Sequence, residues 1–447
     1  MQPLPKEFEE QMKRLLGEAG FFAYLDALNQ PYTRALRVNL LLRPDGTPPC
    51  PIEGLGAPVP WAKGAYFVEG DARPGLSPLH EGGLFYMQEP SALTAVTALD
   101  PQPGERVLDL CAAPGGKSTQ IAALMAGRGL LCCNEPIPSR AQILSRNIER
   151  MGVRNAVVLS AMPDALAPRF PAFFDRILVD APCSGEGMFR RQPEARDEWD
   201  ADAPRRCADR QMEILAQAAK MLLPGGTMVY STCTFNDTEN EGVLKRFLAL
   251  HPEFSLVPFA LPGLPEAKDG YLHLYPHEMH GEGHFVSRLK KADEAVQAAP
   301  QRKAPARAAA KGKAPVPIAL PDVFSDAFAP ERLYTAGDAL WMLPEGISIE
   351  RLSGLRVLRT GLLLAHAEGK RSEPDHALAM ALRPEEAART ASLTQTQALA
   401  YQAGETLSLG DLPGGYTLLC CEGVSLGWGK QAGGLMKNHY PKGLRRR

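Results

Sequence analysis

The chain has 447 residues, about three times the ~150 residues of an average domain, so we expect two to four domains. Apolar residues make up 45% and charged residues 22%, a globular composition that excludes wholesale disorder. The 49 Lys and Arg against 51 Asp and Glu give a net charge of −2, which argues against a uniformly basic protein that coats nucleic acid.

The first 90 residues predict a small α/β appendage. Phe8, Met12, Leu15 and Leu16 have the spacing of an amphipathic helix. Two strand-like runs follow, RALRVNLLLR at 34–43 and GAYFVEG at 64–70, and a proline-rich stretch separates them.

No segment is suited to secretion or to crossing a membrane. The N-terminal 18 residues are too charged for a signal peptide, and no run of 18 apolar residues occurs. The nine cysteines are an odd number without a C-x-x-C pair, which favours free thiols in a reducing, intracellular location over disulfides or structural zinc. We therefore expect a cytoplasmic protein without a metal.

An alternation of strands and helices from about residue 106 to 290 predicts a doubly wound parallel sheet. Ligands of such sheets bind at the carboxyl ends of the strands, so the residues after each strand are candidates for a site. Buried parallel strands form short, continuous apolar runs, and we expect them at Arg106–Leu110, Leu130–Asn134, Ala156–Ser160, Asp175–Asp180 and Thr227–Ser231.

The turn after the first of these strands is typical of a cofactor loop. Asp109 ends the strand, Pro114-Gly115-Gly116 forms a tight turn, and Lys117 opens a helix. Small residues allow close approach of the backbone, and a helix N-terminus offers unpaired N–H groups. GGKST resembles a phosphate-binding loop, but Cys111 occupies the position of that motif's first glycine, and the G-x-G-x-x-G fingerprint is absent.

Acids and thiols follow the other strands. Glu135 ends the second strand about 20 residues after the glycine turn, the usual place of a carboxylate that binds ribose hydroxyls. Cys183 follows Asp180 at the fourth strand, and Cys233 follows Ser231 at the fifth. Because these strand ends share one edge of a parallel sheet, we expect the two thiols and the acids to converge in one cleft beside the cofactor loop.

Three motifs, DLCAAPGGKS, DAPCSGEGMFR and YSTCTFNDTENE, resemble in order the signature motifs of the RNA cytosine-5 methyltransferases, the Sun and nucleolar-protein family. The tail GVSLGWGKQAGGLMKNHYPKGLRRR resembles the PUA-like RNA-binding module of the bacterial ribosomal small-subunit methyltransferase F subgroup, and LRVNLLLR and MQEPSA resemble its N-terminal part. The resemblance implies a class I Rossmann-like methyltransferase fold, S-adenosyl-L-methionine as methyl donor, and RNA as partner.

The resemblance also assigns roles to the two thiols, which chemistry alone leaves open because DNA cytosine methyltransferases use the Pro-Cys cysteine, here Cys183. It implies that Cys233, the Thr-Cys cysteine, is the nucleophile that adds to carbon 6 of cytosine, and that Cys183 helps to release the product. Asp180 and Lys117 are expected to orient and polarise a flipped base, with Asp180 at its Watson–Crick edge.

The implied cofactor contacts come from the loop and from the strand ends. Near the adenine amino group the family generally offers an acid, but the alignment puts Met162 there, with Asp164 as the alternative side chain. The expected set is Cys111, Ala112, Ala113, Pro114, Gly115, Gly116, Lys117, Glu135, Arg140, Met162 and Asp180.

Two groups of cations interleaved with aromatic residues are candidates for RNA contact. For the first, a solvated arginine face is the alternative. The first group is Phe189-Arg190-Arg191, Arg196 and Trp199, and the second, after the last acid Glu422, is Lys430, Lys437, Lys442 and Arg445–Arg447 with Trp428 and Tyr440.

Residues 295–317 are rich in Ala, Pro, Lys and Arg, without an acid or an aromatic residue, and are expected to be a linker. Residues 295–447 hold 19 Lys or Arg and 14 Asp or Glu, a charge of +5, whereas residues 1–294 carry −7. The expected parts are an N-terminal RNA-binding appendage at 1–90, the catalytic domain at 91–294, the linker, a small module at 318–390 and a PUA-like RNA-binding module at 391–447.

The sequence therefore predicts a monomeric S-adenosyl-L-methionine-dependent enzyme that forms 5-methylcytosine in RNA, with small-subunit ribosomal RNA as the expected substrate. One alternative is a DNA cytosine-5 methyltransferase, against which the Thr-Cys motif and the basic C-terminal part argue. The other is a non-catalytic RNA-binding ribosome assembly factor, against which the presence of both Cys183 and Cys233 argues.

Overall fold

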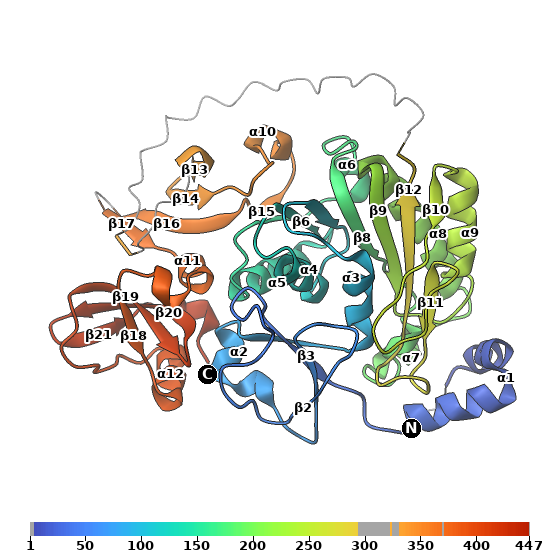
Figure 1. Cartoon of the computed structure of the whole chain (residues 1–447), viewed down its shortest axis with the longest axis horizontal. Helices are drawn as coiled ribbons and strands as arrows, with labels where there is room; N and C mark the ends of the chain where they lie inside the picture. The colour runs from blue at the N-terminus through green and yellow to red at the C-terminus, as the bar shows by residue number, and fades with distance from the viewer. Residues whose placement is uncertain (1–3, 294–321, 324–329, 369–370, 447) are drawn as a thin grey trace.

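The centre of the molecule is a mixed nine-stranded sheet (Figure 1). The computed structural model describes residues 4–293, 322–323, 330–368 and 371–446. The sheet order is β10-β12-β9-β8-β5-β6-β7-β15, with β11 paired to β12; neighbours from β9 to β7 are parallel. The strands are β5 (Arg106–Asp109), β6 (Leu130–Asn134), β7 (Ala156–Leu159), β8 (Phe174–Asp180), β9 (Leu222–Thr232), β10 (Phe254–Leu256), β11 (Tyr271–Leu274), β12 (His284–Lys291) and β15 (Val357–Arg359).

All five predicted strands are confirmed, although β9 begins five residues before the predicted start at Thr227. The strands are continuously apolar because both faces are buried. Cys132, for example, lies in the core on one face and Cys133 in the core on the other. One face is covered by α3 (Thr94–Leu99), α4 (Gly116–Leu124) and α5 (Pro138–Arg150), and the other by α6 (Pro163–Leu166), α8 (Ala203–Met221) and α9 (Glu241–Leu250).

The N-terminal appendage consists of α1 (Lys6–Leu28) and a separate four-stranded antiparallel sheet. The predicted helix is present, but its predicted apolar face is wrong at Leu15, whose side chain is 36% exposed. The reason is that α1 changes direction at Gly17, which has a left-handed φ of 69°, so the buried positions continue at Phe21 and Tyr24 instead. The sheet has the order β2 (Leu55–Pro58), β3 (Ala65–Val68), β1 (Ala35–Val38) and β4 (Phe85–Gln88), with α2 (Pro78–Glu81) beside it.

The C-terminal part contains two further four-stranded sheets that share one core, in which Leu364 and Trp428 both take part. The predicted linker at 295–317 lies outside the described residues. The first sheet is β13 (Leu333–Ala336), β14 (Ala339–Met342), β16 (Leu362–Glu368) and β17 (Arg371–Pro374); the second is β18 (Thr390–Ser392), β19 (Gly415–Cys421), β20 (Val424–Ala432) and β21 (Leu435–Asn438), with α10 (Ile349–Leu352), α11 (His376–Ala381) and α12 (Gln395–Ala403) around them.

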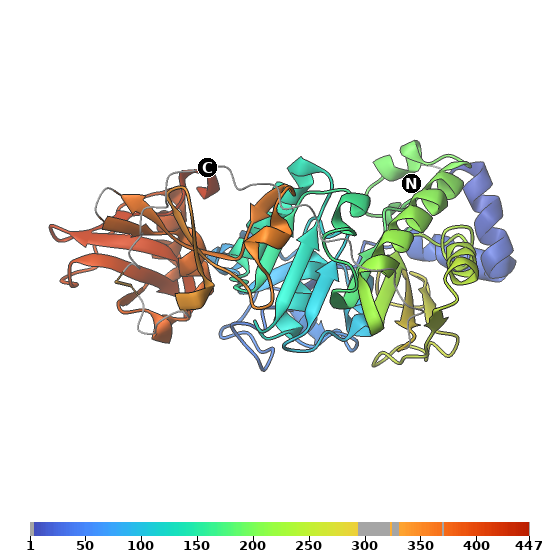
Figure 2. The ribbon, with the colours of Figure 1, turned by 90° about the horizontal axis from the view of Figure 1, so that it is seen from above.

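The N-terminal and C-terminal parts are joined through packing. Leu36 and Phe85 of the N-terminal sheet lie in one hydrophobic core with Tyr401 and Leu419 of the C-terminal part. At the opposite end of the molecule, α1 packs on the catalytic domain (Figure 2). Among the described residues, no helix has the length and apolarity needed to span a membrane.

Candidate active site

A cavity of about 810 Å³ opens at the carboxyl ends of β5, β6, β7 and β8. This volume suits a cofactor-sized ligand. The predicted residues Cys111, Ala113, Glu135, Arg140, Met162, Asp180, Cys183 and Cys233 all line it, together with Asp164.

The two thiols predicted to do chemistry are in contact, with 3.3 Å between the Sγ atoms of Cys183 and Cys233. Their loops are tied by the backbone N–H of Gly187, which donates to the carbonyl of Cys233 at 2.8 Å. The hydrogen bond with Cys233, together with burial, raises the pKa of Cys183 well above that of an ordinary thiol. Because two adjacent thiolates repel each other, one of the pair keeps its proton.

Asp180 lies beside the thiols at the end of β8 and has three polar neighbours. Lys117 Nζ is 2.8 Å from its Oδ2, Ser231 Oγ donates to its Oδ1 at 2.8 Å, and His284 Nε2 is 3.6 Å from Oδ1. Although burial alone would raise the pKa of Asp180, the Lys117 ammonium and the His284 ring hold it below its usual value. Burial likewise opposes the charge on Lys117, but Asp180 raises the pKa of Lys117 overall. The pair is therefore a carboxylate and an ammonium ion, whose side chains are 28% and 13% exposed.

The cofactor loop is held by neighbouring elements. Gly115 has a φ of 114°, a left-handed conformation that a residue with a Cβ adopts only with strain. The Ser118 hydroxyl donates to Asp109 Oδ2 at 2.6 Å, and from α5 Asn147 Nδ2 donates to the carbonyl of Pro114 at 2.9 Å. Burial raises the pKa of Asp109 to about 7.

The opposite side of the cavity combines a carboxylate with an apolar slot. Glu135 Oε1 accepts the backbone N–H of Ile137 at 3.0 Å, and Glu135 Oε2 is 3.4 Å from Arg140 Nη1. Met162 is 61% exposed, and it lines the cavity with Pro163 and other apolar side chains. A carboxylate next to an apolar slot and an unpaired helix N-terminus fits the ribose, the adenine and the amino-acid end of S-adenosyl-L-methionine.

Four family profiles match the chain in order. They are described as the N-terminal domain of 16S rRNA methyltransferase RsmF (residues 4–90), 16S rRNA methyltransferase RsmB/F (96–290), the RsmF rRNA methyltransferase first C-terminal domain (322–382) and the methyltransferase RsmF PUA domain (388–446). The chain is also similar to ribosomal RNA small subunit methyltransferase F of Erwinia tasmaniensis, with 34% identity over 98% of this chain and 96% of that protein. It belongs to the ribosomal RNA small subunit methyltransferase F family.

Other relatives agree with this family. The protein of the same name from Escherichia coli is 33% identical over 98% of this chain and 96% of its own. Among solved structures, a methyltransferase homolog from Pyrococcus horikoshii has 30% identity and a TM-score of 0.54 over 64% of this chain and 95% of that one. NSun6 from the same organism, solved with SFG, supports the fold with a TM-score of 0.56 and 23% identity over 65% of this chain and 99% of that one.

The first group predicted to contact RNA is mostly buried in this family member. Phe189 is 0% exposed and Trp199 8%, and both pack against Phe8 of α1. Arg190 forms a buried ion pair with Glu282, with 2.7 Å between Arg190 Nη2 and Glu282 Oε1. The prediction of RNA stacking is thus wrong for Phe189 and Trp199, and Arg190 and the buried Arg196 have structural roles; Arg191 is exposed and stays a prediction.

The second group is also divided by burial. Trp428 is 2% exposed, and its Nε1 donates to the carbonyl of Asp375 at 2.8 Å. Tyr440 is 3% exposed. Neither ring is free to stack on a base, whereas Lys437 and Lys442 are exposed and stay candidates.

Sequence reasoning missed several polar residues of the site. His284 and Ser231 face Asp180, and Arg210 of α8 lines the cavity. Glu239 accepts the backbone N–H of Ser184 at 3.1 Å and so braces the Cys183 loop. Glu186 accepts the backbone N–H of Phe235 at 2.8 Å and braces the Cys233 loop. The sequence signal that could have located these two residues was an acid within the glycine-rich motif SGEG, for Glu186, and another within the TENE run, for Glu239.

Proposed function

We propose that this protein transfers a methyl group from S-adenosyl-L-methionine to carbon 5 of a cytosine in RNA, with small-subunit ribosomal RNA as substrate. The observation that carries the proposal is the pair of thiols 3.3 Å apart, in one cavity with Asp180, whose carboxylate is bonded to Lys117. The names of the relatives support ribosomal RNA as the substrate class.

The methyl donor supplies an electrophilic methyl group when bound. The loop from Cys111 to Lys117 and the side chains of Glu135, Arg140, Met162 and Asp180 would hold it. Glu135 is placed to accept hydrogen bonds from the ribose hydroxyls, and Met162 to pack on the adenine.

The attack step uses Cys233 and the Lys117–Asp180 pair. The Cys233 sulfur bonds to carbon 6, and the electron pair of the 5,6 double bond moves toward N3, which gains a proton. Asp180 is a carboxylate and accepts a hydrogen bond from the exocyclic amine, while the Lys117 ammonium donates the proton to N3 and regains one from the Cys233 thiol. Carbon 5 becomes an enamine carbon that is able to attack the methyl group.

Product release requires that carbon 5 lose its proton and that the bond from carbon 6 to sulfur break. While Cys233 is bonded to the base it is a neutral thioether, so the hydrogen bond and the charge of Cys233 no longer raise the pKa of Cys183. Cys183 can then give its proton to water and, as a thiolate, accept the proton on carbon 5. The electron pair of that C–H bond restores the double bond and expels Cys233 as a thiolate, which regains the N3 proton by way of Lys117.

We also infer the division of labour along the chain. The appendage at 1–90 and the PUA-like module at 391–447 bind RNA, and the domain at 91–294 methylates it. The basic charge of residues 295–447, +5, against −7 for residues 1–294 supports RNA binding by the C-terminal part. We propose that the protein acts as a monomer in the cytoplasm.

Two cysteine variants test the reaction, with Cys207→Ser as the matched control because Cys207 is a partly exposed thiol that does not line the cavity. Cys233→Ser should abolish 5-methylcytosine formation, read by bisulfite sequencing of ribosomal RNA, while cofactor binding persists. Cys183→Ala should accumulate a covalent protein–RNA adduct under denaturing conditions. Methylation by Cys233→Ser would refute the assigned nucleophile, and equal methylation of DNA would favour the alternative substrate.

A further inference from the structure

The outer face of α5 joins the catalytic cavity to the C-terminal end of the chain. Arg140 in its first turn lines the catalytic cavity. Arg146 and Arg150, further along, line a second cavity of about 240 Å³ together with Tyr440 of the C-terminal part. The ten residues from Arg140 to Arg150 span about 15 Å at the rise of an α-helix. Ile143, between them, is 50% exposed.

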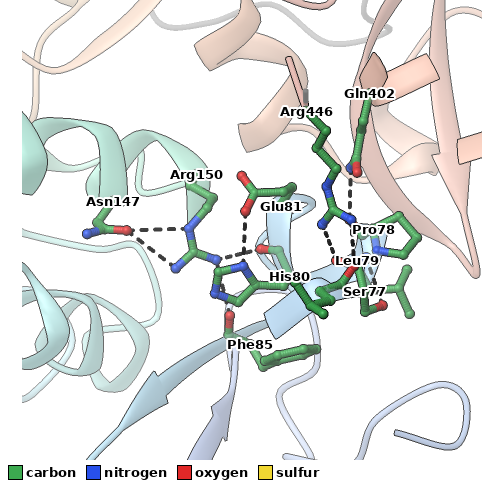
Figure 3. A network of polar contacts seen from close by, with 11 residues as sticks. Ser77, Pro78, Leu79, His80, Glu81, Phe85, Asn147, Arg150, Gln402 and Arg446 are labelled. Carbon is green, nitrogen blue, oxygen red and sulfur yellow. Dashed lines mark hydrogen bonds and ion pairs between the residues drawn. The ribbon is translucent and has the colours of Figure 1, made fainter. Parts of the chain in front are cut away.

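The cations at the second cavity donate to backbone carbonyls instead of pairing with carboxylates (Figure 3). Arg150 Nη1 donates to the carbonyl of Phe85 at 3.2 Å, and Arg446 Nη2 to that of Ser77 at 3.0 Å. Arg146 Nη2 is 3.5 Å from the carbonyl of Gly443. Such bonds satisfy the donors without neutralising the positive charges, so the three guanidinium groups add their potentials, against which the Glu81 carboxylate acts.

The nearby acids are engaged elsewhere. Glu81 lies 3.1 Å from His80, and the hydrogen bond to His80 lowers the pKa of Glu81 in spite of its partial burial. Glu149 pairs with Arg359, whose side chain is 5% exposed. Burial lowers the pKa of Arg150 although the Glu81 carboxylate raises it, and Glu81 is one negative charge against three guanidinium groups. The junction therefore keeps a net positive charge toward solvent.

We propose that the RNA strand beside the target cytosine lies along this face, with its phosphates on Arg146 and the exposed Lys442 and the charges of Arg150 and Arg446 beneath them. This inference rests on the proposed function. We call the face formed by Arg140, Ile143, Arg146, Arg150, Lys442 and Arg446 the α5 track. An RNA backbone fits it because the cations are spaced along a helix that begins at the cavity, and exposed Ile143 can pack against a base or a ribose.

The test is RNA affinity of the full-length protein as a function of salt. Arg146→Glu and Lys442→Glu reverse the two exposed charges, and Lys245→Glu at an exposed position of α9, on the opposite side of the molecule from the C-terminal part, is the matched control (Figure 1). The probe is a fluorescently labelled, protein-free fragment of small-subunit ribosomal RNA, followed by anisotropy between 50 and 200 mM salt. Because each phosphate contact adds about 0.7–0.9 to the slope of log K against log salt, we expect a slope smaller by about 1 for each variant and affinity about tenfold weaker at low salt.

Arg146→Lys keeps the positive charge, so it should have the salt slope and most of the RNA affinity of the wild type. If Arg146 served only to contact the carbonyl of Gly443, this variant would have no such advantage over Arg146→Glu. The inference would be overturned if both charge reversals gave affinities within twofold of Lys245→Glu and the same salt slope as that control. A loss confined to assembled ribosomal subunits would also overturn it, since the partner would then be a ribosomal protein. The proposed function fails separately, if the wild-type protein forms no 5-methylcytosine.

Discussion

The buried ion pair of Arg190 with Glu282 offers the sharpest test of the reassigned RNA cluster. Arg190 Nε and Nη2 donate to the two carboxylate oxygens at 2.8 and 2.7 Å, and the side chains are 8% and 2% exposed. Arg190 Nη1 also donates to the carbonyl of Ala27, the penultimate residue of α1, at 2.7 Å. Replacing Arg190 by Met leaves a buried carboxylate with only backbone donors and removes one attachment of α1 to the loop after Cys183.

Removing one partner of a buried ion pair typically costs about 3–5 kcal/mol, because the remaining charge stays desolvated. At 1.4 kcal/mol per factor of ten, Arg190→Met should favour local opening of α1 and this loop by about 100- to 3000-fold. The double variant Arg190→Met/Glu282→Leu removes both charges, so we expect it to be less destabilised than Arg190→Met alone.

Hydrogen exchange of the α1 amides measures this opening without requiring the whole chain to unfold in one step. The control is Arg206→Met, which breaks the exposed pair with Asp200, whose side chains are 57% and 54% exposed, and should leave exchange unchanged. The reasoning is refuted if Arg190→Met exchanges like the wild type while its RNA affinity falls. That outcome would indicate that Arg190 contacts RNA, as the sequence pattern predicted.

Three further changes have defined outcomes. Glu135→Ala removes a charged hydrogen-bond acceptor worth about 1.5–3 kcal/mol, so calorimetry should show cofactor affinity about 10- to 100-fold weaker. Asp164→Ala should weaken the affinity less. Unchanged affinity of Glu135→Ala would contradict the assignment of Glu135 to the ribose. Folding raises the pKa of Asp109 from 3.8 to about 7, so the stability contributed by its protonated form is complete below pH 3.8 and is lost as the pH rises through about 7. Urea unfolding at pH 5 and pH 8 should show this loss of stability in the wild type and not in Asp109→Asn. An equal loss in both proteins would contradict the assignment. Trp428→Ala should lower the stability of the C-terminal sheets by about 3–5 kcal/mol, and a purely RNA-binding defect at wild-type thermal stability would refute its burial.

The sequence was sufficient where local pattern and topology agree. Apolar runs located the five strands of the parallel sheet. The rule that the carboxyl ends of such strands share one edge correctly predicted that one cavity contains Glu135, Asp180, Cys183 and Cys233. The structure adds that Lys117 pairs directly with Asp180, at 2.8 Å.

What the sequence could not supply depends on contacts between distant segments. His284 lies beside Asp180 because β12 pairs antiparallel with β9, and no local sequence pattern predicts that pairing. An aromatic residue among cations has the same sequence pattern whether it stacks on RNA or packs inside the protein, and α1, which precedes it by more than 150 residues, decides the case of Phe189. Burial and exposure of Trp428 and Lys442 are likewise set by the C-terminal sheets.

The strand β15 has a consequence for how the enzyme is made. It pairs antiparallel with β7 and so covers the edge of the nine-stranded sheet. Val357 pairs with Leu159, so the partner residues are about 200 positions apart in the chain. A ribosome adding about 5–20 residues per second leaves that edge uncovered for about 10–40 s of synthesis. During this interval the backbone of β7 is open to pairing with other nascent chains. The Met162 side of the cavity is also incomplete, since the N–H of Ser160, two residues before Met162, bonds to the carbonyl of Arg356 at 2.9 Å. The methyltransferase sheet is therefore finished only when the C-terminal part has been translated.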